Sequence, residues 1–240
     1  MNPLDLFLTL YIWNLAVISC IITFIICIIC YPFVEQKTFS RIYESIPGYI
    51  IMYAMIIPGF WDLKIVDRRK DKSWNERYIV VANHLSFVDS LIMAVSIPIK
   101  KKYMMAEKFF KIPIFGWMTK SSGNISVNRR DKNSTSTSVE KAIKTIEVDN
   151  CSFGIYCEGK RETIPYVMET FKTGAFRIAY KTKLPILPVT LLGTSEAMSY
   201  GGIASRAKIL VIIDEPFNVE NEDYSFYANK TKNIIQKNLE

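Results

Sequence analysis

Residues 78–90 read YIVVANHLSFVDS, and this stretch decides how the middle of the chain is expected to fold. Residues 78–82 form a short, apolar, β-branched run, which is typical of a buried strand. Asp89 is a good helix N-cap residue and precedes the apolar residues 91–94. The stretch therefore predicts a strand, a turn that contains His84, and a helix that begins at Asp89.

His84 and Asp89 lie five positions apart. On a continuous helix, their side chains would point about 140° away from each other. A turn over residues 85–88 instead lets Asp89 fold back and accept the imidazole N–H. That contact fixes the tautomer of the ring and leaves its other nitrogen as a base for a hydroxyl group. The alternative is an ordinary histidine at a strand end beside a helix cap, and the spacing alone favours this alternative.

The chain has one histidine, which excludes a metal site with two His ligands. No Ser or Cys occupies a nucleophile-elbow sequence such as G-x-S-x-G. We therefore expect His84 to activate a hydroxyl group of the substrate itself, which attacks an activated acyl group without an acyl-enzyme. Backbone N–H groups near the helix start at Asp89 are expected to stabilise the oxyanion. No metal or redox cofactor is predicted.

Two later segments also combine a short strand with charged residues at its end. Residues 123–130 read GNISVNRR, and residues 156–161 read YCEGKR. Arginine suits bidentate capture of phosphate oxygens, and the backbone N–H groups of a glycine-containing turn can bind an anion. Arg129, Arg161 and the turn at Gly159 therefore predict a phosphate site. Taken singly, each segment is more often a solvated charged loop.

An N-terminal run, residues 6–34, carries no charged side chain. As a helix it would be longer than the roughly 30 Å hydrocarbon core of a bilayer, so we expect a retained helix that spans or enters the membrane. A cleaved signal peptide fits less well, because no Lys or Arg precedes the run and no small-residue cleavage site follows it. Lys37 and Arg41 after the run, against Asp5 before it, predict a catalytic domain on the cytoplasmic face.

A second apolar stretch, residues 49–57, is bounded by Pro-Gly pairs and is too short to cross a bilayer. Its tyrosines and the following Trp61 favour a segment that lies in the headgroup zone, and a buried strand or helix of the core is the alternative. The chain has a net charge of +7, and all 30 of its lysine and arginine residues lie beyond residue 36. Beside a membrane anchor, this charge indicates membrane lipids and an anionic substrate as partners, and no nucleic-acid motif is present.

The length of 240 residues is enough for one sizeable domain. We predict a membrane anchor over residues 1–62 and one α/β catalytic domain over residues 63–240, with a mixed sheet flanked by helices, because short β-rich runs alternate with helical patterns there. The expected strands are 78–82, near 103–105, 124–127, 153–157, 186–192 and 208–213. The expected helices are 89–96, 108–119, 134–148, 174–181 and one within 223–239.

Four segments occur in the order and spacing of a known family. Residues 83–89 match N-H-x4-D, and residues 123–129, which follow IPIFGW, resemble G-x-x-[F/L]-[I/V]-x-R. Residues 156–161 stand where that family has F-P-E-G-T-R, with FKTGAF downstream, and residues 184–189 resemble V-P-[I/V]-[I/V]-P-V. The chain thus resembles the glycerolipid acyltransferase superfamily, whose best-known members are the 1-acyl-glycerol-3-phosphate acyltransferases.

The resemblance implies that His84 is the catalytic base and Asp89 its partner. The implied acceptor phosphate site consists of Arg129, Glu158, Gly159 and Arg161. The implied reaction transfers a fatty acyl chain from an acyl-CoA or acyl-carrier-protein thioester to lysophosphatidic acid and gives phosphatidic acid. Acylation of another lysophospholipid or of glycerol-3-phosphate is one alternative, and a catalytically silent, lipid-binding membrane adaptor is the other.

Three residues depart from the family pattern: Cys157 replaces Pro, Lys160 replaces Thr, and Ser126 stands where a bulky apolar residue is usual. Lys160 adds a cation that can contact the phosphate of the acceptor or of CoA, so the departures bear on acceptor identity. Cys157 in a basic setting suggests a reactive thiol, but a small residue packed at a strand end is the favoured interpretation. The five cysteines form no disulfide or zinc pattern.

Overall fold

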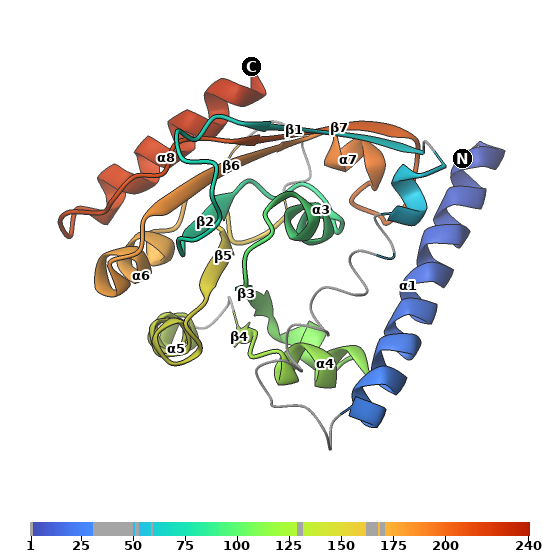
Figure 1. Ribbon diagram of the computed structural model, residues 1–240, viewed down its shortest axis with the longest axis horizontal. Coiled ribbons are helices and arrows are strands. Elements are labelled where there is room, and N and C mark those ends of the chain that lie inside the picture. The colour runs from blue at the N-terminus through green and yellow to red at the C-terminus, as the bar shows by residue number, and fades with distance from the viewer. Residues whose placement is uncertain are drawn as a thin grey trace.

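A mixed β-sheet forms the centre of the computed structural model, which describes residues 2–30, 50, 53–58, 60–128, 132–161, 168 and 171–240 (Figure 1). Within these residues the sheet has seven strands. In spatial order they are β1 (Trp61–Asp67), β7 (Ala207–Ile213), β6 (Ile186–Leu192), β2 (Ile79–Ala82), β5 (Ser152–Tyr156), β3 (Lys101–Ala106) and β4 (Ile125–Val127). Neighbouring strands are parallel except β6 and β7, which are antiparallel.

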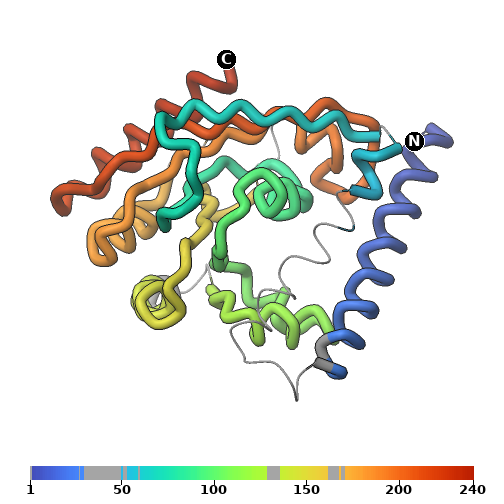
Figure 2. Tube along the Cα trace, in the orientation of Figure 1, coloured from blue at the N-terminus to red at the C-terminus, as the bar shows by residue number. Residues whose placement is uncertain are grey.

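Helices cover both faces of this sheet, as Figures 1 and 2 show. One face packs against α1 (Pro3–Cys30), α3 (Asp89–Ser96) and α7 (Thr194–Ala197). The other packs against α5 (Lys132–Asp149), α6 (Gly174–Thr182) and α8 (Tyr224–Leu239). The predicted α/β fold with a mixed sheet flanked by helices is confirmed.

β2 lies near the middle of the sheet, between β5 and β6, and all four of its residues are buried. Because side chains alternate along a strand, Val80 and Ala82 enter the core under α3, while Ile79 and Val81 enter the core under α5 and α6. A fully apolar run is what a strand buried on both faces requires. The residues that follow Ala82 therefore emerge from a rigid central strand.

Three parts of the fold differ from the prediction, and one of them is the short helix α7, which was not predicted. The expected continuous helix over 108–119 is wrong: the chain forms the 3₁₀ helix η1 (Glu107–Lys111), a turn, and then the short helix α4 (Phe115–Ser121). Pro113 explains the break, because its ring removes a backbone N–H and disfavours helical geometry in the preceding residue. β1 was not predicted, since charged residues interrupt its apolar pattern, and the predicted domain boundary after residue 62 falls inside this strand.

α1 is apolar along its length, and the segment Pro3–Ile26, with a mean hydropathy of 2.1, is long and apolar enough to cross a membrane. Its N-terminal half packs on the core of the sheet through Leu8 and Ile12, which are buried. Its other half exposes aliphatic side chains, which are Val17, Ile18, Ile21, Ile22, Ile25, Ile28 and Ile29. An apolar helix is therefore present, and its insertion into a membrane stays a prediction.

The second apolar stretch is described in part. Residues 53–56 are helical, and Met55 is fully buried against the same core as α1, whereas Tyr53 and Ile57 are exposed. This short helix thus packs on the domain and also presents apolar side chains at the surface. The end of the predicted membrane run, residues 31–34, and the charged residues Lys37 and Arg41 lie outside the described residues.

Gly193 directly follows β6, at a point where the backbone of β7 approaches closely, so a substitution there tests this packing. Its φ is +77°, and an added Cβ would lie 1.9 Å from the backbone oxygen of Lys208. We expect Gly193→Ala to lower the free energy of unfolding by at least about 1–3 kcal/mol, the strain of a positive φ alone. Gly201→Ala is the control, because its Cβ would meet only Ser199 Oγ at 3.9 Å. Equal chemical-denaturation midpoints for the two variants would contradict this packing.

Candidate active site

The turn after β2 brings Asp89, the first residue of α3, back onto His84. His84 Nδ1 lies 2.7 Å from Asp89 Oδ2. Asp89 is fully buried, while 15% of the His84 side chain is exposed. The fold-back that was predicted for residues 85–88 is present, and the imidazole is held on one edge while the ring stays accessible.

Asp89 Oδ2 also accepts the backbone N–H groups of Leu85, at 2.7 Å, and of Ser86, at 2.9 Å. Hydrogen bonds to an ionised acceptor are among the strong ones, so this single oxygen fixes the conformation of the turn. Both amides therefore already have an acceptor in this structure. The expectation that N–H groups near the start of α3 stabilise the oxyanion stays a prediction.

Tyr156, the last residue of β5, stacks on the face of the His84 ring. The ring centroids are 4.1 Å apart and the planes are within 13° of parallel. The Tyr156 hydroxyl lies 3.3 Å from Ser90 Oγ. Burial raises the pKa of Tyr156 well above its usual value, so the phenol is uncharged at neutral pH. Tyr156 thus limits rotation of the imidazole; the sequence signal was its position at the end of a strand adjacent to β2.

The backbone of His84 is fixed from two neighbouring strands. Glu158 Oε1 accepts the His84 N–H at 3.1 Å, and Glu158 is 3% exposed. Asn83 pairs with Leu191 of β6, donating to its carbonyl and accepting from its N–H, both at 2.8 Å. Glu158 was expected in the acceptor phosphate site, which stays a prediction, and one of its observed partners is the main chain of His84.

The turn after β5 places Gly159 at a φ of +76°. A Cβ there would lie 2.7 Å from both Cε and Nζ of Lys172, so the lysine side chain crosses directly over the glycine. The Lys172 N–H also donates to the Cys157 carbonyl at 2.8 Å. Lys172 therefore adds a cation beside the predicted phosphate turn, next to the exposed Lys160. Lys172 belongs to the FKTGAF segment, but the sequence analysis did not predict it to lie in the site.

Arg161 lies in a slot between two aromatic rings, which we call the aromatic slot. Its guanidinium carbon is 3.5 Å from the Phe87 ring centroid and 4.5 Å from that of Tyr200. Burial lowers the pKa of Arg161, and the charge of Asp89 opposes that shift. Because an arginine side chain stays protonated in proteins, the slot holds a cation near the His84–Asp89 pair. Neither Phe87 nor Tyr200 was predicted to take part.

The described site residues thus converge on the carboxyl ends of β2 and β5, which are neighbours in the sheet. His84 and Asp89 follow β2, and the turn from Glu158 to Arg161 follows β5. Arg129 lies outside the described residues, so its predicted place in the site is untested. Ligands of open α/β sheets commonly bind at such carboxyl ends.

Residues 64–192 match the family described as Acyltransferase. The chain belongs to this acyltransferase family. A chloroplastic 1-acyl-sn-glycerol-3-phosphate acyltransferase of Brassica napus is 29% identical over 228 residues, which cover 93% of this chain and 64% of the relative. The 1-acyl-sn-glycerol-3-phosphate acyltransferase of Saccharomyces cerevisiae is 27% identical over 67% of this chain and 53% of its own length. The chain thus spans roughly half to two thirds of these curated relatives.

The crystal structure of another protein has a similar fold. The 1-acyl-sn-glycerophosphate acyltransferase PlsC of Thermotoga maritima superimposes with a TM-score of 0.78 and 20% sequence identity. The match covers 98% of this chain and 94% of that one. It therefore includes α1 as well as the sheet.

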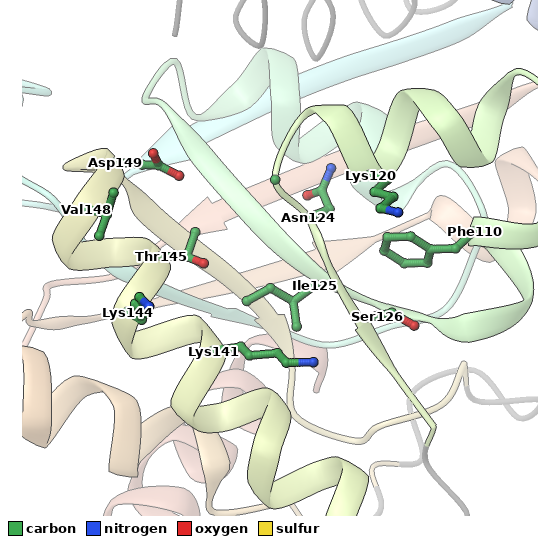
Figure 3. A pocket seen from close by; sticks show the side chains of 11 residues that line it. Phe110, Lys120, Asn124, Ile125, Ser126, Lys141, Lys144, Thr145, Val148 and Asp149 are labelled. Carbon is green, nitrogen blue, oxygen red and sulfur yellow. The ribbon is translucent and has the colours of Figure 1, made fainter. Parts of the chain in front are cut away.

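A cavity of about 440 Å³ lies at the β4 edge of the sheet (Figure 3). Its walls come from β4, α5 and the segment around η1 and α4. Three lysines line it, Lys120, Lys141 and Lys144, together with Phe110 and Ser126. Among the described residues, none of the predicted catalytic or phosphate-site residues lines this cavity.

Cys157 is buried at the end of β5, beside Glu158. Burial, and secondarily the charge of Glu158, raises the pKa of its thiol. A raised pKa lowers the thiolate fraction at neutral pH below that of an ordinary cysteine, and the thiolate is the reactive form. The packed small residue, rather than a reactive thiol, is the interpretation that this environment supports.

We therefore expect Cys157 in the folded protein to resist alkylation by iodoacetamide at pH 7.5, as followed by mass mapping of the peptide. The same peptide should react at an ordinary rate in guanidinium chloride, which is the control. Cys157→Ala should lower the free energy of unfolding by roughly 1 kcal/mol, the effect of a small cavity. Rapid alkylation of native Cys157 would contradict the assignment.

Proposed function

We propose that the chain is a membrane-bound O-acyltransferase that moves a fatty acyl chain to the free hydroxyl of 1-acyl-glycerol-3-phosphate, giving phosphatidic acid. The donor is a thioester of CoA or of an acyl-carrier protein. The observation that carries the proposal is the 2.7 Å contact of His84 with Asp89 beside Arg161 in its aromatic slot, a base next to a phosphate-binding cation. The names of the relatives support the same acceptor.

His84 acts as the general base in this proposal. With Nδ1 donating to Asp89, Nε2 removes the proton of the acceptor hydroxyl as its oxygen attacks the thioester carbonyl. Asp89 stabilises the imidazolium that forms. The tetrahedral intermediate collapses, the C–S bond breaks, and the imidazolium returns its proton to the departing thiolate. An ester and a free thiol result, and none of these steps requires a metal or redox cofactor.

The phosphate of the acceptor binds to the turn after β5. The Arg161 guanidinium offers a forked pair of donors to two phosphate oxygens, and the positive φ of Gly159 turns the backbone tightly there. Lys160 and Lys172 add positive charge beside this turn, and Arg129 contributes on the basis of the family resemblance. Glu158 supports the reaction indirectly, because it holds the His84 backbone.

α1 anchors the protein in this proposal, with the catalytic domain on the cytoplasmic face. The exposed aliphatic side chains of its C-terminal half suit contact with lipid. An anchor brings the site to the bilayer surface, where acceptor and product both partition. The charges at Lys37 and Arg41 are the basis for the choice of face.

The two alternative functions are acylation of a different acceptor and lipid binding without catalysis. A different acceptor, either a lysophospholipid with a headgroup or glycerol-3-phosphate, uses the same base; Arg161 favours a terminal phosphate over a phosphodiester. A catalytically silent lipid-binding adaptor needs no oriented base. The intact contacts of His84 with Asp89 and Tyr156 argue against the adaptor.

The proposal is tested with the purified full chain in phospholipid vesicles, offered labelled acyl-CoA or acyl-carrier protein. The acceptors are 1-acyl-glycerol-3-phosphate, glycerol-3-phosphate and lysophosphatidylcholine, with products identified by mass. We expect phosphatidic acid from the first acceptor. His84→Ala should lower its formation by at least about 10²-fold, because general-base help is lost, without unfolding the protein.

Two results would overturn the proposal. Faster acylation of glycerol-3-phosphate or lysophosphatidylcholine than of 1-acyl-glycerol-3-phosphate would show that the acceptor is wrong. Near-normal turnover by His84→Ala would show that the base is wrong. Asp89→Asn serves as a second variant, since it keeps the size of the side chain while removing its charge.

A further inference from the structure

Trp13 of α1 contacts the loop that carries Tyr200. Its indole Nε1 donates to the Gly202 carbonyl at 3.0 Å. The ring also lies against Gly202 itself, since a Cβ at that glycine would be 3.1 Å from an indole carbon. One turn earlier on α1, Thr9 Oγ1 accepts the Ala204 N–H at 3.0 Å. Two residues of the predicted membrane helix thus fix the loop over residues 198–204.

The same indole contacts the turn that joins His84 to Asp89. Trp13 and Phe87 pack edge to face, with ring centroids 6.2 Å apart and an interplanar angle of 74°. Phe87 lies within that turn and forms one wall of the aromatic slot around Arg161. Trp13 therefore contacts the residue that supports one side of the guanidinium.

The other wall of the slot belongs to the loop that Trp13 holds. Tyr200 lies 4.5 Å from the guanidinium carbon, and its carbonyl oxygen accepts from Arg161 Nη1 at 3.4 Å. The loop is closed by its own hydrogen bonds, from the Gly202 N–H to the Ser199 carbonyl and from the Ser199 N–H to the Ile203 carbonyl, both 2.9 Å. Holding Gly202 therefore also holds Tyr200.

The loop and the turn are joined to each other as well. Ser86 Oγ donates to the Met198 carbonyl at 2.6 Å, and Ser86 is fully buried. The Ser86 N–H is one of the three groups bound by Asp89. α1, the loop and the turn form one hydrogen-bonded unit around Arg161.

We infer that Trp13 is a positioning residue of the acceptor site, which holds both walls of the aromatic slot so that the Arg161 guanidinium is oriented before the phosphate binds. This inference rests on the proposed function for the identity of the acceptor. An arginine side chain has several rotatable bonds, and fixing them in advance lowers the entropy lost on binding. α1 is then part of the site as well as an anchor.

If α1 acted only as an anchor through lipid contact, substitutions of its exposed apolar side chains would have similar effects on KM. If Trp13 positions Arg161, its substitution should have a larger effect than the others. Trp13 is 45% exposed and Phe7, on the same helix, is 53% exposed, so both offer apolar surface to a membrane. Phe7 packs on Tyr11 and Phe60, outside the aromatic slot and the loop. Phe7→Ala is therefore the matched control for Trp13→Ala.

The kinetic test measures KM and kcat for 1-acyl-glycerol-3-phosphate in phosphatidylcholine vesicles, with vesicle binding measured by flotation. We expect Trp13→Ala to raise KM about 3- to 10-fold with a smaller change in kcat. This rise in KM is about what the loss of a cation–π contact to Arg161 would cause. Trp13→Phe keeps a ring against Phe87 but loses the hydrogen bond to Gly202. Its KM should therefore lie between those of the wild type and Trp13→Ala. Phe7→Ala should leave KM unchanged.

A double-variant cycle separates positioning from general destabilisation. Arg161→Ala should raise KM more than Trp13→Ala does, and adding Trp13→Ala to it should change KM little further, because the group that Trp13 positions is gone. Additive effects of the two substitutions would overturn the inference. So would a KM for Trp13→Ala equal to that of Phe7→Ala.

A measurement without turnover distinguishes this inference from the proposed function. Phenylglyoxal modifies arginine side chains, and mass mapping of the full chain in vesicles reports the rate at Arg161. Trp13→Ala should increase this rate because the aromatic slot loosens, whereas Phe7→Ala should not. An unchanged rate would overturn the inference even in an active protein. If the wild-type chain forms no phosphatidic acid but the rate rises, the acceptor assignment fails and the positioning role stands.

Discussion

Asp89 Oδ2 binds three N–H groups, those of the His84 ring, Leu85 and Ser86, and the rest of the site depends on this one oxygen. The contacts close the turn between β2 and α3, so strand, turn and helix share a fixed geometry. Burial of the carboxylate in a site without these donors would be costly, which makes the turn and the ring orientation interdependent. Tyr156 and Glu158 then restrain the face of the ring and its backbone.

From this turn a chain of contacts extends outward to α1, the predicted membrane helix. Phe87 lies in the turn, Arg161 lies on Phe87, and Trp13 of α1 contacts both Phe87 and the loop that carries Tyr200. The proposed base and the proposed phosphate-binding arginine are thus joined through the same few aromatic contacts. In the proposed function, where the acceptor resides in a bilayer, such a link would place the predicted membrane helix next to the arginine proposed to bind the phosphate.

The local chemistry of the sequence predicted β2, the turn and the start of α3, because each is set by residues close in sequence. β1 was missed because its stability comes from pairing with β7, nearly 150 residues later, while its own pattern alternates with charges. The break before α4 follows from Pro113 and could have been predicted from the sequence. The aromatic slot could not have been predicted, because no local pattern marks Phe87 and Tyr200 and only the fold brings them together.

The central claim is that Asp89 sets the tautomer of His84, and the single histidine makes it directly measurable by ¹⁵N NMR of the histidine-labelled chain. At a pH where the ring is neutral, we predict a proton on Nδ1 and none on Nε2. Asp89→Ala removes the acceptor of the Nδ1 proton, so it should abolish this preference. A wild-type ring protonated on Nε2 would contradict the account.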